Sequence, residues 1–404
     1  PYCAKSLGTA DPVGDYQPAI CTPHAVASLR QLGGGSAGRA IDARNELLPL
    51  VLAEMELRYY MYSAHLDQGP DAAQRAKEDL VSAWESGTFE ATCAIYALRY
   101  GVFSAADYLF VGEGKTFADA REYESEVYAS VKADVEEALV EGGASPVKAA
   151  LETLRALRDI LRSAIEFKGL TLGSYLDFQA NLQGRLARPV TGPPVFRNQQ
   201  LLALIDAGIV RLAFGPSPLV VPTAGGLLVR STRFAQACEM TFDYLVRAHI
   251  ETPTLDGSTS PLLANLARRG RARAMVLDGT PVGSIDLSND FHPITDEGVE
   301  RRLWVFGAVT EGARYFNLYI PSPRSRVRAF VDAELCAKAV VTGTPQATGR
   351  ENGAQKATAP RSSSPLRIAL VNNMPDAAFE ETERQFRELL GGWPGLEVEL
   401  RCFA

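Results

Sequence analysis

Apolar side chains recur at the spacing of an α-helix through most of residues 41–190, and this pattern limits the fold more than any other feature of the sequence. The clearest helix follows Ser145 and Pro146, which supply an N-cap and a first-turn proline. Gly169 is expected to end it. Its apolar stripe consists of Val147, Leu151, Leu154, Leu157, Leu161 and Ile165. Stripes of this kind are buried in cores, so we expect a mostly helical region over 41–190.

The run QLGGGSAGRA, residues 31–40, places Gly33, Gly35 and Gly38 at the spacing of a dinucleotide-binding loop. Such a loop needs a buried strand directly before it, because the glycines turn the chain toward the next helix. Here the preceding TPHAVASLRQL reads as a short helix. The segment that follows also reads as helix, with Asp42 as a cap and Pro49 delaying the regular part. We therefore interpret the glycines as a flexible connection between helices.

The predicted secondary structure changes from mostly helical to mixed helix and strand after residue 195. A short helix is predicted to end at Gly208, and two β-rich stretches follow, IVRLAF (209–214) and LLVRST (227–232). RARAMVLDGTPVGSIDLS predicts a further strand pair that turns at Asp278 and Gly279. This part of the chain is expected to be α/β or α+β.

Residues 303–340 combine three parts that cofactor sites use. LWVFGAV predicts a compact apolar strand, TEGARYFNLYIPSPR a loop, and SRVRAFVDAELCAKAV an amphipathic helix. A strand, a glycine-bearing loop and a helix N-terminus together form anion or cofactor sites at the carboxyl end of a sheet.

The remaining sequence divides into a linker and an incomplete unit. Residues 341–365 lack aromatic side chains and are rich in Thr, Ala, Gly, Ser, Gln and Pro, which is typical of a flexible linker. Residues 366–404 read as strand, turn, helix and strand, with Asp376 as a cap. This segment is too short to bury the core of an α/β domain, so we expect it to begin a truncated α/β unit.

Composition excludes several classes of function. A formal net charge of -7 argues against a nucleic-acid partner. No apolar run is long enough for a membrane span, and the first residues do not resemble a secretory signal, so the expected location is cytoplasmic. The six cysteines and four histidines show no metal-ligand spacing, so no metal site is expected.

Residues 38–340 resemble a bacterial FAD/NAD(P)-binding protein family of biosynthetic clusters. The resemblance rests on AGRAIDARNELLPLVLAEMELRYY, IEFKGLTLGSYLDF, LLALIDAGIVRL and LWVFGAVTEGARYFNLYIPSPRSRVRAFVDAEL. It implies an FAD/NAD(P)-binding, Rossmann-like domain over 1–340, with the helical region 41–190 on the substrate side. In the family an N-terminal Rossmann unit with G-x-G-x-x-G after its first strand holds FAD. We find no such unit here, so we expect an incomplete domain that starts inside the family's pattern.

The same resemblance implies a set of cofactor-binding residues: Gly307, Thr310, Glu311, Gly312 and Asn317. They fall where flavoproteins bring backbone N–H groups and a helix N-terminus to the flavin. The family's strand commonly ends in Gly-Asp, whereas Ala308 follows Gly307 here, which leaves that carboxylate contact without a counterpart. Alternatively, Gly307 and Gly312 only turn the chain, and Glu311 is a solvated loop charge.

Residues 366–404 resemble the opening of the homoserine O-acyltransferase family, a branch of the class I glutamine amidotransferase fold. The matching positions are Asn373, Met374 and Pro375 in a turn and Thr382, Glu383 and Gln385 in a helix. The family's nucleophilic cysteine lies further along its sequence, and Cys402 does not match it. No acyl transfer is therefore assigned to this chain.

Together these resemblances predict part of an FAD-dependent, NAD(P)H-linked oxidoreductase or monooxygenase that acts on a small molecule, with N-oxygenation of an amino acid as a special case. Flavin chemistry requires no catalytic triad, which fits the scarcity of His and Cys constellations. One alternative is a non-catalytic remnant or partner-binding scaffold. Another is part of a bifunctional protein with an acyltransferase-like or amidotransferase-like domain.

Two further clusters have both a functional and an ordinary interpretation. LARRGRARA, with Arg268, Arg269, Arg271 and Arg273, either clamps the 2'-phosphate of NADPH or forms a solvated basic face. SIDLSNDFHPITDEG either forms a metal or acid-base site or presents water-facing carboxylates; its members are Asp286, Asp290, His292, Asp296 and Glu297. The solvated interpretation is preferred for both.

Overall fold

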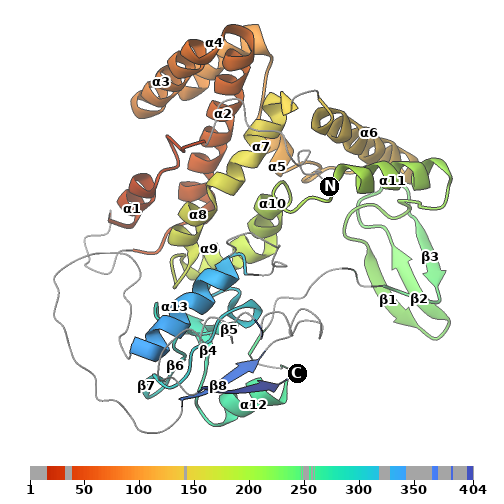
Figure 1. Cartoon of the computed structure of the whole chain (residues 1–404). Helices are drawn as coiled ribbons and strands as arrows, with labels where there is room; N and C mark the ends of the chain where they lie inside the picture. The colour runs from red at the N-terminus through yellow and green to blue at the C-terminus, as the bar shows by residue number, and fades with distance from the viewer. Residues whose placement is uncertain are drawn as a thin grey trace. The chain divides into compact units, whose positions relative to one another are not determined.

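The computed structural model divides the chain into two compact units, Pro1–Ile250 and Glu251–Ala404, which are described separately (Figure 1). The described residues are 16–31, 39–140, 143–246, 248, 254–255, 258, 260–317, 328–342, 366–371, 384 and 398–403. The glycine run 32–38, the linker from 343 to 365 and most of the predicted helix within 376–390 lie outside them. None of the helices in these ranges combines the length and the hydropathy of a membrane span.

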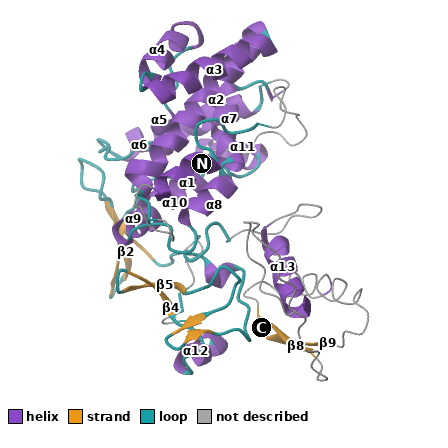
Figure 2. Cartoon of the chain, turned by 90° about the vertical axis from the view of Figure 1, so that its left-hand side faces the viewer, coloured by secondary structure: helices purple, strands orange, loops and turns teal. Residues whose placement is uncertain are grey.

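The first unit is mainly helical, as its apolar periodicity predicts (Figure 2). Helix α2 is its centre, and α3, α4, α5 and α7 pack against it. The helices are α1 (Pro23–Gln31), η1 (Ala43–Leu47), α2 (Leu48–Gln68), α3 (Pro70–Ser86), α4 (Phe89–Tyr100), α5 (Ala105–Leu109), α6 (Ala120–Ala138), α7 (Pro146–Ala156), α8 (Arg158–Ile165), α9 (Leu172–Asp177), η3 (Phe178–Leu182), α10 (Gln183–Ala187) and α11 (Val195–Asp206).

The start of α2 confirms two predictions. The carboxylate of Asp42 accepts hydrogen bonds from the backbone N–H groups of Arg44 and Asn45, as an N-cap does. The segment it caps is the π-helical turn η1, and the regular α2 begins only at Leu48, with Pro49 in its first turn. Proline has no N–H to donate and is therefore tolerated only in the first turn, which explains the late start.

The predicted helix after Ser145 forms, but as two helices. The Ser145 hydroxyl accepts from the Lys148 N–H and caps α7, and the chain breaks at Leu157 before α8. Gly169 does not end the second helix, which already stops at Ile165. Gly169 instead permits a close approach: a Cβ at this residue would lie 2.0 Å from the carbonyl oxygen of Ala164. Backbone contacts this short exclude every side chain.

A three-stranded antiparallel sheet completes the first unit, with the order β1 (Leu219–Thr223), β2 (Gly226–Arg230) and β3 (Glu239–Phe242). The predicted strand LLVRST thus corresponds to β2. The predicted strand over 209–214 is wrong. Ile209 and Val210 both donate their N–H groups to the carbonyl of Leu204 at the end of α11, and the Leu212 N–H donates to the Glu124 carboxylate. These amides are not available to a sheet.

The described residues of the second unit form short antiparallel strand pairs, the helices α12 and α13, the 3-10 turn η4 and one parallel strand pair. The predicted hairpin forms from β4 (Ala274–Leu277) and β5 (Thr280–Ile285). Asp278 and Gly279 both have positive φ, as a two-residue hairpin turn requires. The other elements are α12 (Pro261–Arg268), β6 (Ile294–Thr295), β7 (Gly298–Val299), η4 (Ala308–Thr310), α13 (Arg328–Thr342), β8 (Leu366–Val371) and β9 (Val398–Phe403). Strands β8 and β9 are parallel, and the whole described chain is a mixture of helices and small sheets of the α+β kind.

Candidate functional site

The five residues predicted to bind a cofactor lie together in one loop, residues 303–317, which we call the Gly307 loop. Thr310 and Glu311 are 1 % exposed and Asn317 is 8 % exposed. The Glu311 carboxylate accepts the backbone N–H of Phe316 (3.1 Å) and that of Asn317 (2.5 Å). The Asn317 side-chain amide donates to the Thr310 hydroxyl (3.1 Å). Glu311 is therefore not a solvated loop charge: these side chains form the internal frame of the loop.

The strand predicted over 303–309 is wrong. Residues 303–306 are irregular, and η4 begins at Ala308. Their backbone groups are used by the preceding loop: Val305 donates its N–H to the Phe291 carbonyl (2.8 Å), and the imidazole Nδ1 of His292 donates to the Leu303 carbonyl (2.7 Å). The Trp304 ring packs on that imidazole at 4.8 Å between centroids. An apolar run alone could not distinguish this arrangement from a strand.

At Gly307 the backbone of the loop has open space beside it. Gly307 has φ +86°, and no heavy atom of the described residues lies within 4 Å of the position that a Cβ would occupy. The indole Nε1 of Trp304, three residues away, is buried without a hydrogen-bond partner among the described residues. Open space at a left-handed glycine and a buried donor without a partner are the two features of this loop that are compatible with a ligand. Gly312 in contrast donates its N–H to the Arg314 carbonyl (2.8 Å) and so belongs to the frame.

A buried ion pair fastens this loop to α13, and sequence reasoning missed it. Arg314 is 2 % exposed and donates to both oxygens of Asp332 (3.2 and 3.3 Å). Asp332 also accepts from Arg328 (2.7 Å), one helical turn earlier. The Arg314 guanidinium lies 4.5 Å from the centroid of the Phe291 ring. The i, i+4 spacing of Arg328 and Asp332 was visible in the sequence, but the long-range partner was not.

The basic segment near residue 270 is neither a free phosphate clamp nor wholly solvated. Arg271 pairs with Glu300 (2.5 Å), and Arg273 pairs with Asp286 (3.2 Å) and Asp296 (3.1 Å). Asp286 is fully buried, which corrects the expectation that the carboxylates of its segment face water, whereas Asp296 is 91 % exposed at its side chain. Arg268 and Arg269 are exposed, as predicted.

A small cavity of about 190 Å³ lies beside the pair of Arg273 and Asp296. It is lined by Leu255, Ala267, Gly270, Ala272, Arg273, Ala274 and Asp296. The described residues hold no cluster of three or more His, Cys, Asp or Glu arranged to bind a metal ion.

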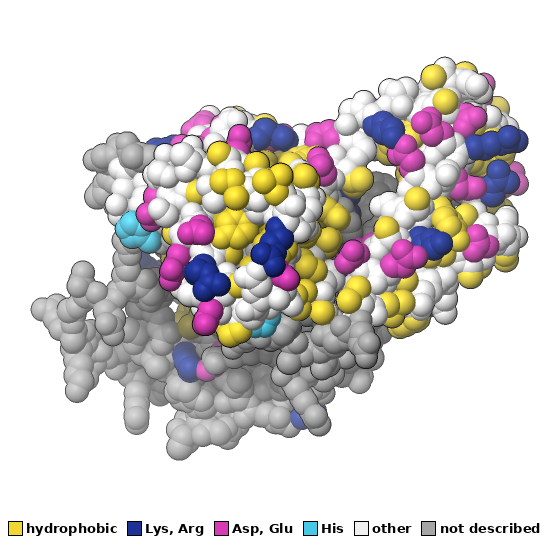
Figure 3. Space-filling view, turned by 90° about the horizontal axis from the view of Figure 1, so that it is seen from above, with side chains coloured by type: hydrophobic (Ala, Val, Ile, Leu, Met, Phe, Trp, Pro, Cys, Tyr) yellow, Lys and Arg dark blue, Asp and Glu magenta, His cyan; other side chains and the backbone are white. Residues whose placement is uncertain are grey.

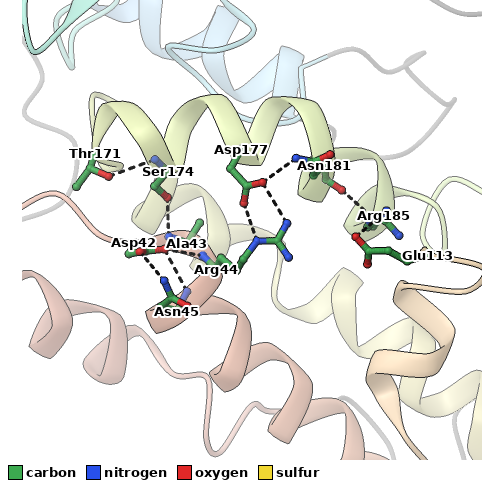
Figure 4. Close-up of polar contacts among 10 residues, drawn as sticks. All are labelled: Asp42, Ala43, Arg44, Asn45, Glu113, Thr171, Ser174, Asp177, Asn181 and Arg185. Carbon is green, nitrogen blue, oxygen red and sulfur yellow. Dashed lines mark hydrogen bonds and ion pairs between the residues drawn. The ribbon is translucent and has the colours of Figure 1, made fainter.

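The first unit has a polar junction of its own, in which both π-helical turns take part (Figure 4). Arg44 of η1 forms two hydrogen bonds with the Asp177 carboxylate (2.8 and 3.1 Å), and Asn181 donates to the same carboxylate (2.7 Å). These donors lower the pKa of Asp177 below its usual value. Arg185, further along the same helical segment, forms an ion pair with Glu113 (3.4 Å). The junction therefore ties α9 to the start of α2 through Asp177 and Arg44, and α10 to the turn after α5 through Arg185 and Glu113.

Helix α2 also carries a buried carboxylate that the sequence reasoning did not single out. Glu54 is fully buried and accepts the backbone N–H groups of Ala19, Ile20 and Cys21 at 2.6 to 3.1 Å, together with the Tyr16 hydroxyl. Burial next to this carboxylate raises the pKa of the Cys21 thiol to about 12. Glu54 follows Leu50 and Val51 by one helical turn on the buried side of α2, and this spacing was the available signal.

No protein-family model matches the chain. It is 25% identical over 346 residues to the nitrosuccinic acid synthase of Aspergillus oryzae, covering 85% of this chain and 52% of that enzyme. It is 24% identical over 364 residues to a nitrosuccinate-forming L-aspartate N-monooxygenase of Streptomyces cremeus, covering 87% of this chain and 54% of that enzyme. The chain thus spans about half the length of these relatives.

A second, local similarity concerns one short stretch. Over 39 residues, 10% of this chain, the sequence is 62% identical to the homoserine O-succinyltransferase of Methylorubrum extorquens, of which it covers 11%.

Proposed function

We propose that this chain is part of a flavin-dependent N-monooxygenase that oxidises the amino group of L-aspartate or a closely similar amino acid. The observation that carries the proposal is the similarity to nitrosuccinate-forming enzymes along 85 to 87% of the chain, from a fungus and from Streptomyces. FAD, when bound, would supply the oxygen chemistry with electrons from NAD(P)H, so that one oxygen atom goes to the nitrogen and the other leaves as water.

Within this proposal the Gly307 loop forms one wall of the flavin site in an incomplete Rossmann-like domain. Gly307 would lie against the ring system, because the space beside it is open. Thr310, Glu311 and Asn317 would act as positioning residues, because their side chains already form hydrogen bonds with one another and with the loop backbone. In this proposal Gly307 alone of the five residues would contact the cofactor directly.

The cavity at Arg273, rather than the helical region 41–190 expected from the sequence, is the proposed substrate site. Its volume of about 190 Å³ suits a small amino acid better than a nucleotide. The Arg273 side chain is 35 % exposed and that of its solvent-side partner Asp296 is 91 % exposed. A substrate carboxylate would replace the Asp296 carboxylate on the guanidinium. Asp286, which is buried, would hold the Arg273 guanidinium in place from the protein interior.

A flavin titration with a matched pair of variants tests the loop assignment. Gly307→Ala and Gly298→Ala carry the same kind of backbone cost, because both glycines have positive φ and open space beside them. Quenching of FAD fluorescence should show binding to the unaltered chain and to Gly298→Ala, and weaker binding to Gly307→Ala. Failure of the unaltered chain to take up FAD would favour the partner-binding scaffold instead.

We also propose that residues 366–404 belong to an α/β unit like the opening of a homoserine O-acyltransferase. The 62% identity over 39 residues and the parallel pairing of β8 with β9 support this. Parallel neighbours require a crossover connection, which is how such units begin. No acyl-transfer activity is proposed on this basis.

A further inference from the structure

Arg314 connects the two ends of the Gly307 loop. Its backbone N–H donates to the Thr310 carbonyl (2.8 Å) and its carbonyl accepts the N–H of Gly312 (2.8 Å), so it closes the turn that follows η4. Its guanidinium lies 4.5 Å from the centroid of the Phe291 ring. The Phe291 carbonyl in turn accepts the N–H of Val305 near the start of the loop (2.8 Å). One residue therefore holds the far end of the loop through its backbone and contacts the anchor of the near end through its side chain.

Hydrogen bonds lead from Arg314 back to Gly307. Thr310 donates both its backbone N–H (3.0 Å) and its hydroxyl (2.7 Å) to the Gly307 carbonyl. Two donors on one carbonyl oxygen fix the orientation of the peptide group that follows Gly307. The backbone conformation beside the open space at Gly307 thus depends on Thr310, and the position of Thr310 depends on Arg314.

The Arg314 side chain is fixed from outside the loop by Asp332 of α13. Figure 3 shows basic and acidic side chains interspersed on one face of the first unit. A surface pair of that unit, Arg99 with Asp67, has side chains that are 57 % and 39 % exposed, and pairs of that kind are screened by water and hold little in place. The side chains of Arg314 and Asp332 are only 1 % and 5 % exposed. Loss of one partner would leave the other charge buried, so this pair strongly favours the arrangement in which the two charges meet.

We propose that Asp332 is a positioning residue for the Gly307 loop: through Arg314 it sets the backbone conformation at Gly307, and thereby the affinity of the chain for flavin. The second part rests on the proposed function, since it requires that the flavin lies against Gly307. Asp332 itself would not touch the cofactor, because its carboxylate already accepts hydrogen bonds from Arg314 and Arg328. Its contribution is to hold one conformation of the loop before the ligand arrives, which lowers the cost of binding.

Hydrogen exchange of the whole chain without flavin tests the first part. Asp332→Asn keeps the size of the side chain and removes its charge. Loop amides that donate hydrogen bonds, such as those of Val305 and Thr310, exchange when the loop opens. We expect exchange in residues 303–317 to become at least about fivefold faster in the variant, while exchange in the β4–β5 hairpin stays unchanged. The hairpin thus separates opening of the loop from damage to the whole fold.

Quenching of FAD fluorescence tests the second part, with Asp134→Asn as the matched control. The control breaks a similarly buried pair with Lys148 in the first unit and should change neither loop exchange nor flavin binding. Asp332→Asn should raise the FAD dissociation constant at least about fivefold. Unchanged loop exchange, equal acceleration in loop and hairpin, or an unchanged dissociation constant in Asp332→Asn overturns the proposal. If the unaltered chain takes up no FAD but the variant shows faster loop exchange, the flavin function is refuted and the positioning role of Asp332 in the loop is confirmed.

Discussion

Replacing Gly169 by alanine should destabilise the first unit strongly. The new Cβ would lie 2.0 Å from the Ala164 carbonyl oxygen and 2.2 Å from the Arg30 guanidinium, and ordinary contact begins at 3.4 Å. Arg30 donates to that same carbonyl at 2.8 Å, so relief of the clash also disturbs this hydrogen bond. Overpacking costs about 1–3 kcal/mol, and a lost hydrogen bond to a charged group about 1.5–3 kcal/mol. We expect a net loss of about 3 kcal/mol.

Thermal unfolding followed by circular dichroism provides the measurement, with Gly173→Ala as the matched control. Gly173 lies in α9, and no heavy atom of the described residues lies within 4 Å of its Cβ position, so Gly173→Ala should stabilise the protein slightly, by less than about 1 kcal/mol. In a unit of this size a loss of about 3 kcal/mol lowers the midpoint by roughly 6–12 °C. If Gly169→Ala unfolds within a degree of the unaltered chain, the close approach of 164 and 169 is refuted.

Three further outcomes follow from two ion pairs and from the burial of the cysteines. Asp177→Asn should lower stability by less than about 1 kcal/mol at pH 7, because the pair with Arg44 is partly solvated. Since the folded-state pKa of Asp177 is lowered, this contribution is fully present above the unfolded-state pKa of about 3.9 and is lost as the pH falls through the lower folded-state pKa. The difference in urea unfolding between the variant and the unaltered chain should therefore shrink steadily as the pH is lowered below about 4. Arg273→Gln should cost about 1–3 kcal/mol by leaving buried Asp286 without this partner, and it should also weaken binding of L-aspartate in calorimetry; unchanged affinity would remove the proposed substrate site. Iodoacetamide at pH 8 should modify the half-buried thiol of Cys238 well before the buried thiols of Cys21, Cys93 and Cys336. Peptide mass spectrometry that shows equal modification rates would contradict the burial of these three thiols.

Local signals in the sequence predicted the elements whose causes are local. Asp42 and Ser145 are caps in both the sequence and the structure, and Asp278 with Gly279 forms the hairpin turn. Strand β1 was harder to recognise because Pro222 lies within it; a sheet tolerates proline where, as here, the strand is at an edge. The end of the helix before Gly169 was misjudged because the glycine serves a long-range contact with Ala164.

The candidate site shows the same limit. The sequence placed Gly307, Thr310, Glu311 and Asn317 in one loop, and the structure does bring their side chains and backbone together. It could not indicate that Glu311 points inward, because that depends on which backbone N–H groups need an acceptor. Nor could it reveal the pairing of Arg314 with an aspartate on α13, since no local pattern encodes such a contact.

The most direct test of the proposed function is the product formed from L-aspartate. The purified chain is supplied with FAD, NADPH and isotopically labelled oxygen gas, and the reaction is analysed by mass spectrometry. Our account predicts an aspartate-derived product whose nitrogen carries labelled oxygen, formed only when NADPH is consumed. Unaltered aspartate in a sample that has visibly bound FAD would contradict it.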